Sequence, residues 1–156
     1  MAETENDSPG VIALPPVIFG AFLMAGLVPE YLFPWPVMAQ TGQYIAGGIV
    51  IAASFVLMPG AVRGFRRAET HLDVRKPTSA IITDGPYRIS RNPIYMSMLL
   101  LYLGIGIMID GVWILLLAAP LVLVIQYGVI LREEAYLERK FGEAYLTYKQ
   151  SVRRWI

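Results

Sequence analysis

Two short segments gather polar and ionisable side chains where long uncharged runs of the chain end. One extends from Asp84 to Tyr95 and the other from Arg132 to Gly142. The first holds an arginine beside an Asn-Pro step, which is typical of a helix start, where free backbone N–H groups favour an anion. The second holds Glu133 and Glu134, whose carboxylates can bind hydroxyl or ammonium groups. We therefore expect the function of the chain in these two segments.

The helix start in the first segment combines several features of a ligand site. Asn92 is a good N-cap residue, and Pro93 suits the first helical position. Arg91 adds a positive charge, and the aromatic rings of Tyr87 and Tyr95 are close in sequence. These features suit a small ligand with a carboxylate group. The alternative is an ordinary capped membrane helix whose arginines extend their charged ends to the interface.

Composition indicates a membrane protein. The chain has 156 residues, of which 56% are hydrophobic, and its mean hydropathy is +0.53. Four stretches lack Asp, Glu, Lys and Arg, and each is long enough for a helix across a hydrocarbon core of about 30 Å. These stretches are Ser8–Pro29, Tyr31–Val62, Asn92–Ile109 and Gly111–Leu131. We predict an all-α integral membrane bundle of four transmembrane helices, forming a single domain over residues 1–156.

The prolines predict where the first two spans are interrupted. Pro15 and Pro16 should interrupt the first span, and Pro29 should end it. The second span should end at Pro59 for the same reason.

The first span is expected to be retained, because the tail before it is acidic. Glu3, Glu5 and Asp7 precede the span with no basic residue, unlike the start of a signal peptide. The chain has no cysteine and one histidine, which argues against a metal centre. We expect membrane lipids and a lipophilic substrate as partners, and neither nucleic acid nor metal.

Positive charge is concentrated in two segments. All thirteen Lys and Arg lie within Arg63–Arg91 or Arg132–Arg154. The positive-inside rule predicts that both segments, and both termini, are cytoplasmic. The first segment is rich in helix breakers and should fold back over the cytoplasmic mouth of the bundle as a loop. The fourth helix should continue into the second segment as an amphipathic extension with a hinge near Gly142.

Taken together, the motifs resemble those of the integral-membrane methyltransferases of the isoprenylcysteine carboxyl methyltransferase and phospholipid methyltransferase group. The matching motifs are Gly85-Pro86-Tyr87, Arg91-Asn92-Pro93-Ile94-Tyr95, Glu133-Glu134 and Phe141-Gly142-Glu143-Ala144-Tyr145. The resemblance covers residues 63–155 and implies transfer of a methyl group from S-adenosyl-L-methionine to a lipophilic acceptor at the cytoplasmic interface.

The resemblance also implies which residues surround the cofactor. These residues are Ile81, Ile82, Tyr87, Arg91, Asn92, Pro93, Tyr95 and Glu133. Glu133 matches the cofactor-binding glutamate of the family, and Glu134 is expected beside it as a candidate catalytic residue or supporting partner. Adjacent residues on a helix diverge by about 100°, so one of the two carboxylates should point elsewhere.

The candidate base follows from a departure from the family pattern. Asn92 stands where the prenylcysteine enzymes carry a histidine, and an asparagine cannot remove a proton near neutral pH. Histidine is the usual proton acceptor near neutral pH, so His71 is the candidate base if the acceptor is an amine or a hydroxyl. The alternative is that His71 is an ordinary loop residue.

The acceptor site departs from the family pattern as well. Val129 stands where the carboxyl methyltransferases place an arginine that can hold the substrate carboxylate. Arg88, Gln126 and Arg132 remain as candidate substrate-binding residues. We therefore favour an acceptor other than prenylcysteine.

Two other functions are compatible with this pattern. A similar scaffold occurs in NADPH-dependent membrane reductases, although the chain shows no dedicated basic cluster for a 2′-phosphate. The other is a small transporter or scaffold without catalysis, but transport of ions usually needs an ionisable residue inside a span, and the four runs contain none. No G-x-G-x-x-G segment follows a strand pattern, which excludes the soluble Rossmann architecture.

Overall fold

The computed structural model describes residues 7–38, 40–73 and 76–156, so Glu3 and Glu5 of the acidic tail lie outside it. Within these ranges the chain is helical and contains no strand. The elements are α1 (Pro15–Leu32), α2 (Gln40–Arg67), the 3-10 turn η1 (Gly85–Arg88), α3 (Pro93–Met108), α4 (Val112–Ile125), the π-helical η2 (Gln126–Ile130), α5 (Leu131–Phe141) and α6 (Glu143–Ser151).

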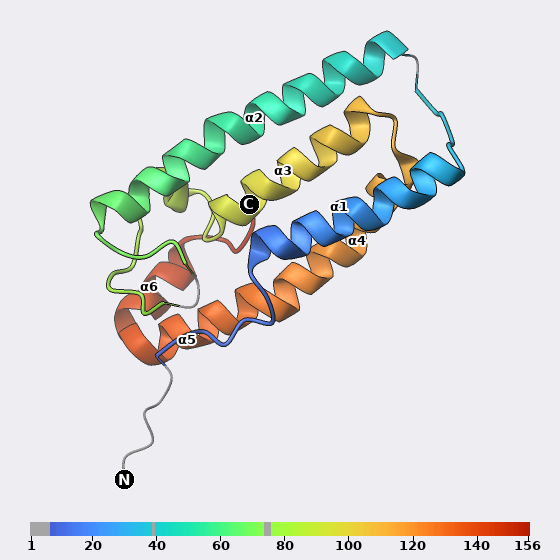
Figure 1. The fold of residues 1–156 in the computed structure, drawn as a ribbon. Coiled ribbons are helices and arrows are strands. Elements are labelled where there is room, and N and C mark those ends of the chain that lie inside the picture. Colours follow the sequence, from blue (N-terminus) through green and yellow to red (C-terminus); the bar gives the residue numbers. More distant parts are fainter. Residues whose placement is uncertain (1–6, 39, 74–75) are drawn as a thin grey trace.

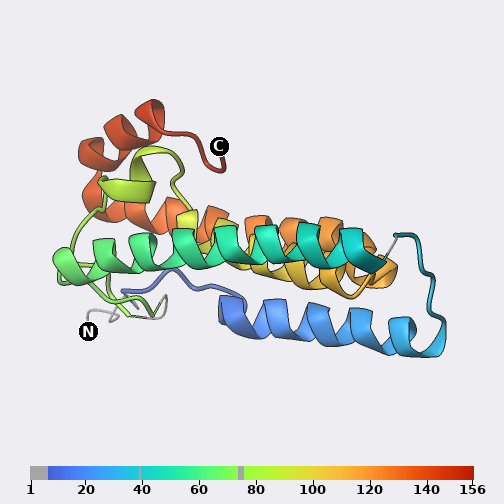
Figure 2. The same cartoon turned by 90° about the horizontal axis from the view of Figure 1, so that it is seen from above.

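The long helices α1 to α4 run alongside one another as a bundle (Figure 1). Helix α2 packs mainly on α3, α1 packs on α4, and α3 joins the two pairs. Helices α5 and α6, the loop after α2 and the segment before α1 gather at one end of the bundle (Figure 2). The α1–α2 and α3–α4 connections lie at the opposite end (Figure 1).

Small residues bring α2 and α3 close together. A Cβ atom on Gly47 would lie 2.7 Å from the Cα of Met108, and one on Gly104 would lie 3.0 Å from the backbone N of Ile51. The Ser54 hydroxyl donates a 2.8 Å hydrogen bond to the backbone carbonyl of Ser97 across the same interface. Glycine and serine therefore allow the two backbones to approach and be joined by polar contacts.

Three helices are long and apolar enough to cross a membrane, namely Pro15–Leu32, Thr41–Arg67 and Val112–Phe141. The apolar helix α3 has 16 residues, which at about 1.5 Å per residue is shorter than a hydrocarbon core of about 30 Å. The prediction of an all-helical membrane bundle is thus confirmed, and the fourth span remains a prediction.

The predicted helix ends at Pro29 and Pro59 were wrong. Helix α1 begins at Pro15 and continues through Pro29 to Leu32. Helix α2 likewise continues through Pro59 to Arg67. A proline removes one hydrogen bond from a helix, but an apolar surrounding offers the other backbone groups no water to bind, so the helix continues.

The predicted extension of the fourth helix is confirmed. Helix α4 passes through η2 into α5, and Gly142, at φ +52°, separates α5 from α6. Tyr145 and Tyr148 of α6 pack with Ile82 and Tyr87 in a second core beneath the loop after α2. This core fixes the loop and η1 against the C-terminal helices.

Prediction on topology: a cysteine at Thr83 should be shielded from a membrane-impermeant maleimide in intact cells and labelled in inverted vesicles. Thr83 is exposed in the loop after α2, and the positive charge of that loop predicts a cytoplasmic position. Pro36→Cys, exposed at the opposite end, is the matched control and should show the reverse pattern. Because the native chain has no cysteine, labelling of the Thr83 variant from outside would overturn this orientation.

Candidate functional site

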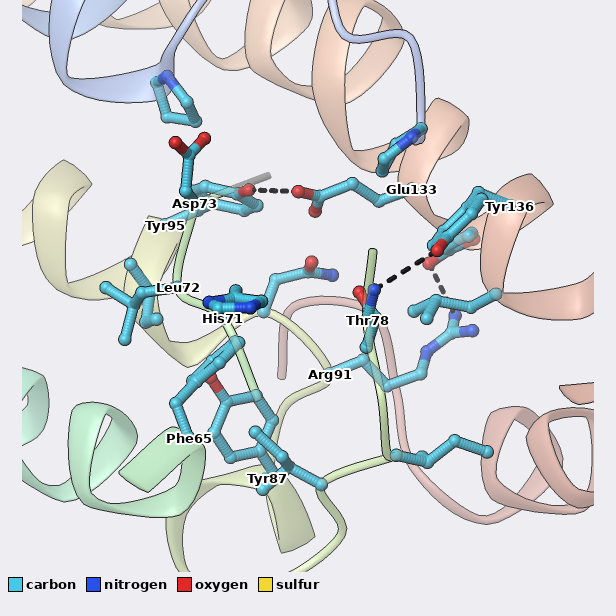
Figure 3. Close-up of a pocket in the computed structure, with 18 of the residues that line it drawn as sticks. Phe65, His71, Leu72, Asp73, Thr78, Tyr87, Arg91, Tyr95, Glu133 and Tyr136 are labelled. Atoms are coloured by element: carbon cyan, nitrogen blue, oxygen red, sulfur yellow. Dashed lines mark hydrogen bonds and ion pairs between the residues drawn. The ribbon is translucent and has the colours of Figure 1, made fainter. Parts of the chain in front are cut away.

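A cavity of about 400 Å³ lies at the end of the bundle where the loop after α2 meets α5 and α6. Its walls come from the segment before α1, the loop after α2, η1, the start of α3, α5 and α6. Figure 3 shows polar side chains entering it from several of these elements. The cavity therefore joins the two polar segments of the sequence, which are separated by an apolar helical hairpin.

Tyr95 and Glu133 meet in this cavity. The Tyr95 hydroxyl donates a 2.7 Å hydrogen bond to Oε1 of Glu133 (Figure 3). Pro93 starts α3 and so places Tyr95 on its first turn. Glu133 lies on the first turn of α5, reached without a break from α4. Helices α3 and α5 thus bring a hydroxyl and a carboxylate together in the cavity.

Arg91 is a buried cation with unused donors. Its side chain is 7% exposed, and its Nη2 lies 3.4 Å from Oε1 of Glu134. Its Nε and Nη1 make no hydrogen bond to any residue that the structure describes. A buried donor without a partner costs free energy, and an anionic oxygen is its strongest partner. Arg91 also lines the cavity, so an anionic group there would satisfy it.

Glu134 turns away from Glu133, as the helical geometry predicted. Its carboxylate accepts hydrogen bonds of 2.9 and 2.8 Å from Nε and Nη2 of Arg154. Its side chain is 6% exposed and also pairs with Arg91. Glu134 is therefore an anion that two arginines share, and its structural role is to hold the C-terminal tail against the segment before α3.

The C-terminal tail packs behind this side of the cavity wall, against Asn92 and Glu134, and our sequence analysis missed it. The backbone carbonyl of Arg154 accepts hydrogen bonds from Nδ2 of Asn92 at 3.0 Å and from the Ser90 hydroxyl at 3.2 Å. The backbone N–H of Arg91 donates to the carbonyl of Arg153. Asn92 is the N-cap of α3 as predicted, but its side chain makes no capping bond. It binds the tail instead.

The segment before α1 closes the opposite side through Tyr136. The Tyr136 hydroxyl donates to Oδ1 of Asp7 at 2.8 Å and accepts from the backbone N–H of Thr78 at 3.2 Å. Lys140 binds both Asp7 and Tyr136. These contacts hold the segment before α1 against the loop that carries His71 and Asp73, both of which line the cavity. Tyr136 and Lys140 lie four residues apart on the polar extension of α4, but no sequence signal links them to Asp7.

Buried tyrosines form a neutral wall. The Tyr148 hydroxyl donates a 2.7 Å hydrogen bond to the carbonyl of Tyr87. Burial raises the pKa of Tyr145 to about 12, with Glu134 adding to the rise and Arg91 opposing it. Burial also raises the pKa of Tyr87 and of Tyr148 well above the usual range. These hydroxyls therefore stay protonated near neutral pH.

Most of the predicted cofactor residues line the cavity, and the predicted substrate residues do not. Ile81, Ile82, Tyr87, Arg91, Asn92, Tyr95 and Glu133 line it, together with the catalytic candidates His71 and Glu134. Pro93 is buried beneath the start of α3. Arg88 borders a separate shallow groove with Thr83 and Thr147.

The other two substrate candidates are engaged elsewhere. Gln126 accepts a 3.0 Å hydrogen bond from the indole N–H of Trp155, and Arg132 donates to the carbonyl of Gly10 at 2.8 Å. Val129, at the position of the family arginine, is fully buried in the bundle core. The substrate-binding roles of Gln126 and Arg132 therefore stay predictions.

Comparison with known proteins agrees with this geometry. The model of the phospholipid methyltransferase family matches residues 42–144. The chain belongs to this family. As a member of the phospholipid methyltransferase family with long apolar helices, it is an integral membrane protein, and its membership implies methyltransferase activity. The family match begins inside α2, earlier than our sequence analysis placed it, and ends near the start of α6.

A second comparison gives a relative without an assigned activity. The methyltransferase is 44% identical over 62 residues to an uncharacterized protein of Haemophilus influenzae (strain ATCC 51907 / DSM 11121 / KW20 / Rd), which covers 40% of this chain and 98% of that protein. No solved structure matches the chain.

Prediction on the buried ion pairs: Glu134→Ala should lower the free energy of unfolding by about 3–5 kcal/mol, because it leaves two partly or fully buried guanidinium groups without their anion. The change should appear as a lower unfolding temperature of the purified methyltransferase in detergent. Glu138→Ala is the matched control on the same helix. Its pair with Lys149 is about one-third exposed, so the expected loss is about 0–1 kcal/mol. Equal, small shifts in both variants would contradict the structural task of Glu134.

Proposed function

We propose that this family member transfers a methyl group from S-adenosyl-L-methionine to a lipophilic acceptor at the cytoplasmic membrane interface. The observation that carries the proposal is the pair of unused, buried donors on Arg91, in the same cavity as the Glu133 carboxylate. A ligand for this cavity should carry both an anionic group and a group that a carboxylate can bind.

The chemistry of the cofactor fits these residues. Its methionyl part has a carboxylate, which Nε and Nη1 of Arg91 would hold through charge-assisted hydrogen bonds. Its ammonium or ribose hydroxyls would bind Glu133, whose orientation is held by Tyr95. The volume of about 400 Å³ lies within the usual range of about 300–1,000 Å³ for small-molecule sites.

The residues of the chain would act by holding and enclosing the reactants. The bound cofactor supplies an electrophilic methyl group on a sulfonium. The Glu133 carboxylate would stabilise nearby positive charge in a site shielded from water. The segment before α1 and the loop after α2, joined through Tyr136, would keep water from the reacting atoms. Alignment of two bound reactants can account for about 7–11 kcal/mol of the barrier.

The charges of the cavity bear on the acceptor. Among the described residues that line it, Arg91 is the one Lys or Arg. With Arg91 assigned to the cofactor, no described cation of the lining is left to hold an acceptor carboxylate. This supports an amine or hydroxyl acceptor, with His71 at the exposed edge of the cavity as the base.

Prediction on cofactor binding: the purified protein should bind S-adenosylmethionine in calorimetry and should not bind NADPH. Arg91→Gln and Glu133→Gln should each weaken binding by about 1–3 kcal/mol, because each removes one charged partner of the cofactor. Arg66→Gln removes an exposed arginine that does not line the cavity and should bind as the parent does. Binding of NADPH without S-adenosylmethionine would favour a reductase instead.

Prediction on the base: His71→Ala should reduce turnover of an amine or hydroxyl acceptor by about 10²–10⁴-fold, because a positioned base removes the acceptor proton. Rapid methylation of a farnesylcysteine analogue by both proteins would refute the acceptor assignment.

A further inference from the structure

Glu134 lies between two guanidinium groups that it binds unequally. Arg154 places Nε and Nη2 on its two oxygens, at 2.9 and 2.8 Å. Arg91 reaches only one oxygen, through Nη2, at 3.4 Å. Both oxygens of the carboxylate are thus occupied by Arg154, and Arg91 makes a looser, single contact.

The unequal binding matters because Arg91 is also the residue proposed to bind the cofactor carboxylate. Planar guanidinium groups prefer to bind carboxylates through two parallel hydrogen bonds. A buried carboxylate without its partner would draw the next available cation, since an unpaired buried charge is costly. Arg91 already touches Glu134, so it would turn Nε or Nη1 towards that carboxylate. Those are the two donors that the structure leaves free at the cavity.

The tail is attached where it can prevent this competition. The carbonyls of Arg153 and Arg154 bind the backbone of Arg91, the Ser90 hydroxyl and the Asn92 side chain. The next residue, Trp155, donates its indole N–H to Gln126. The chain is therefore held on both sides of the Arg154 side chain. This places the Arg154 guanidinium next to Arg91, with which it shares Glu134.

We propose that Arg154 is a positioning residue for Arg91. By occupying both oxygens of Glu134, it leaves Nε and Nη1 of Arg91 free to bind the cofactor carboxylate. This inference rests on the proposed function, because it assigns that carboxylate to Arg91. It extends the site beyond the family match, which ends at residue 144, to the non-helical segment after α6.

The charge balance of the cluster agrees with this role. Arg91, Arg154 and Glu134 together carry one net positive charge, while the Glu133 carboxylate in the same cavity is bound by the Tyr95 hydroxyl. An incoming carboxylate would neutralise it, and the free donors lie on the arginine that lines the cavity.

The test compares two ligands by calorimetry in detergent. Decarboxylated S-adenosylmethionine lacks the group that Arg91 would bind but keeps the ammonium, the sulfonium and the nucleoside. Arg154→Gln should weaken binding of S-adenosylmethionine by about tenfold or more, the effect of losing one buried charged contact. It should change the affinity for the decarboxylated ligand by less than about threefold. Arg139→Gln, an exposed arginine of α5, is the charge control.

A double variant separates positioning from support of the fold. In Glu134→Gln/Arg154→Gln the competing carboxylate is gone, so the affinity for S-adenosylmethionine should return to within about threefold of that of Glu134→Gln alone. This pair leaves no unpaired carboxylate and tests the inference even if Arg154→Gln alone does not fold. An equal loss of affinity for both ligands in Arg154→Gln would overturn the inference. So would a tenfold difference in affinity for S-adenosylmethionine between Glu134→Gln and the double variant. Failure of the parent to bind S-adenosylmethionine would instead refute the proposed function.

Discussion

The burial of one carboxylate, Glu134, is the constraint on which the candidate site depends. An ionised group can be removed from water only with charged partners in good geometry, and Glu134 has two. Its partners come from parts of the chain far apart in sequence: Arg91 lies two residues before α3, and Arg154 lies in the C-terminal tail. The two ion pairs of this carboxylate therefore hold the start of α3, the start of α5 and the C-terminal tail together. The cavity lies beside this cluster.

The apolar helices decide where such a cluster can lie. Each helix satisfies its own backbone hydrogen bonds, so α1 to α4 can lie in hydrocarbon along most of their length. Ionised groups are costly there, so they lie at the two ends of the bundle, and most of them at the end where α5, α6 and the loop after α2 provide polar partners. A cavity at that end has an apolar floor, formed in part by Ile94 and Met98, and charged walls. This is the combination that a charged cofactor and a lipophilic acceptor need side by side.

The sequence predicted the helices and most of the proposed cofactor residues that line the cavity, and particular residues show the physical reasons. Uncharged runs mark apolar helices, Pro93 marks the start of α3, and Gly142 marks the turn before α6, because each acts through local geometry. The roles of Arg154 and Asp7 were not predictable, since both depend on contacts across more than a hundred residues or with a tail that shows no pattern of its own. Pro29 and Pro59 misled the prediction because their effect depends on the surrounding medium.

The two sides of the cavity differ in how firmly they are built, and this difference suits a transferase. Tyr95, Glu133 and Arg91 are held by helix starts, ion pairs and the tail, so the side assigned to the cofactor is rigid. His71 and Pro9 lie on loop segments joined through Tyr136. Loops adapt to change more readily than helices do. A site that must hold one constant methyl donor and admit a bulky acceptor from the membrane is best built with the donor on the helices and the acceptor against the loops.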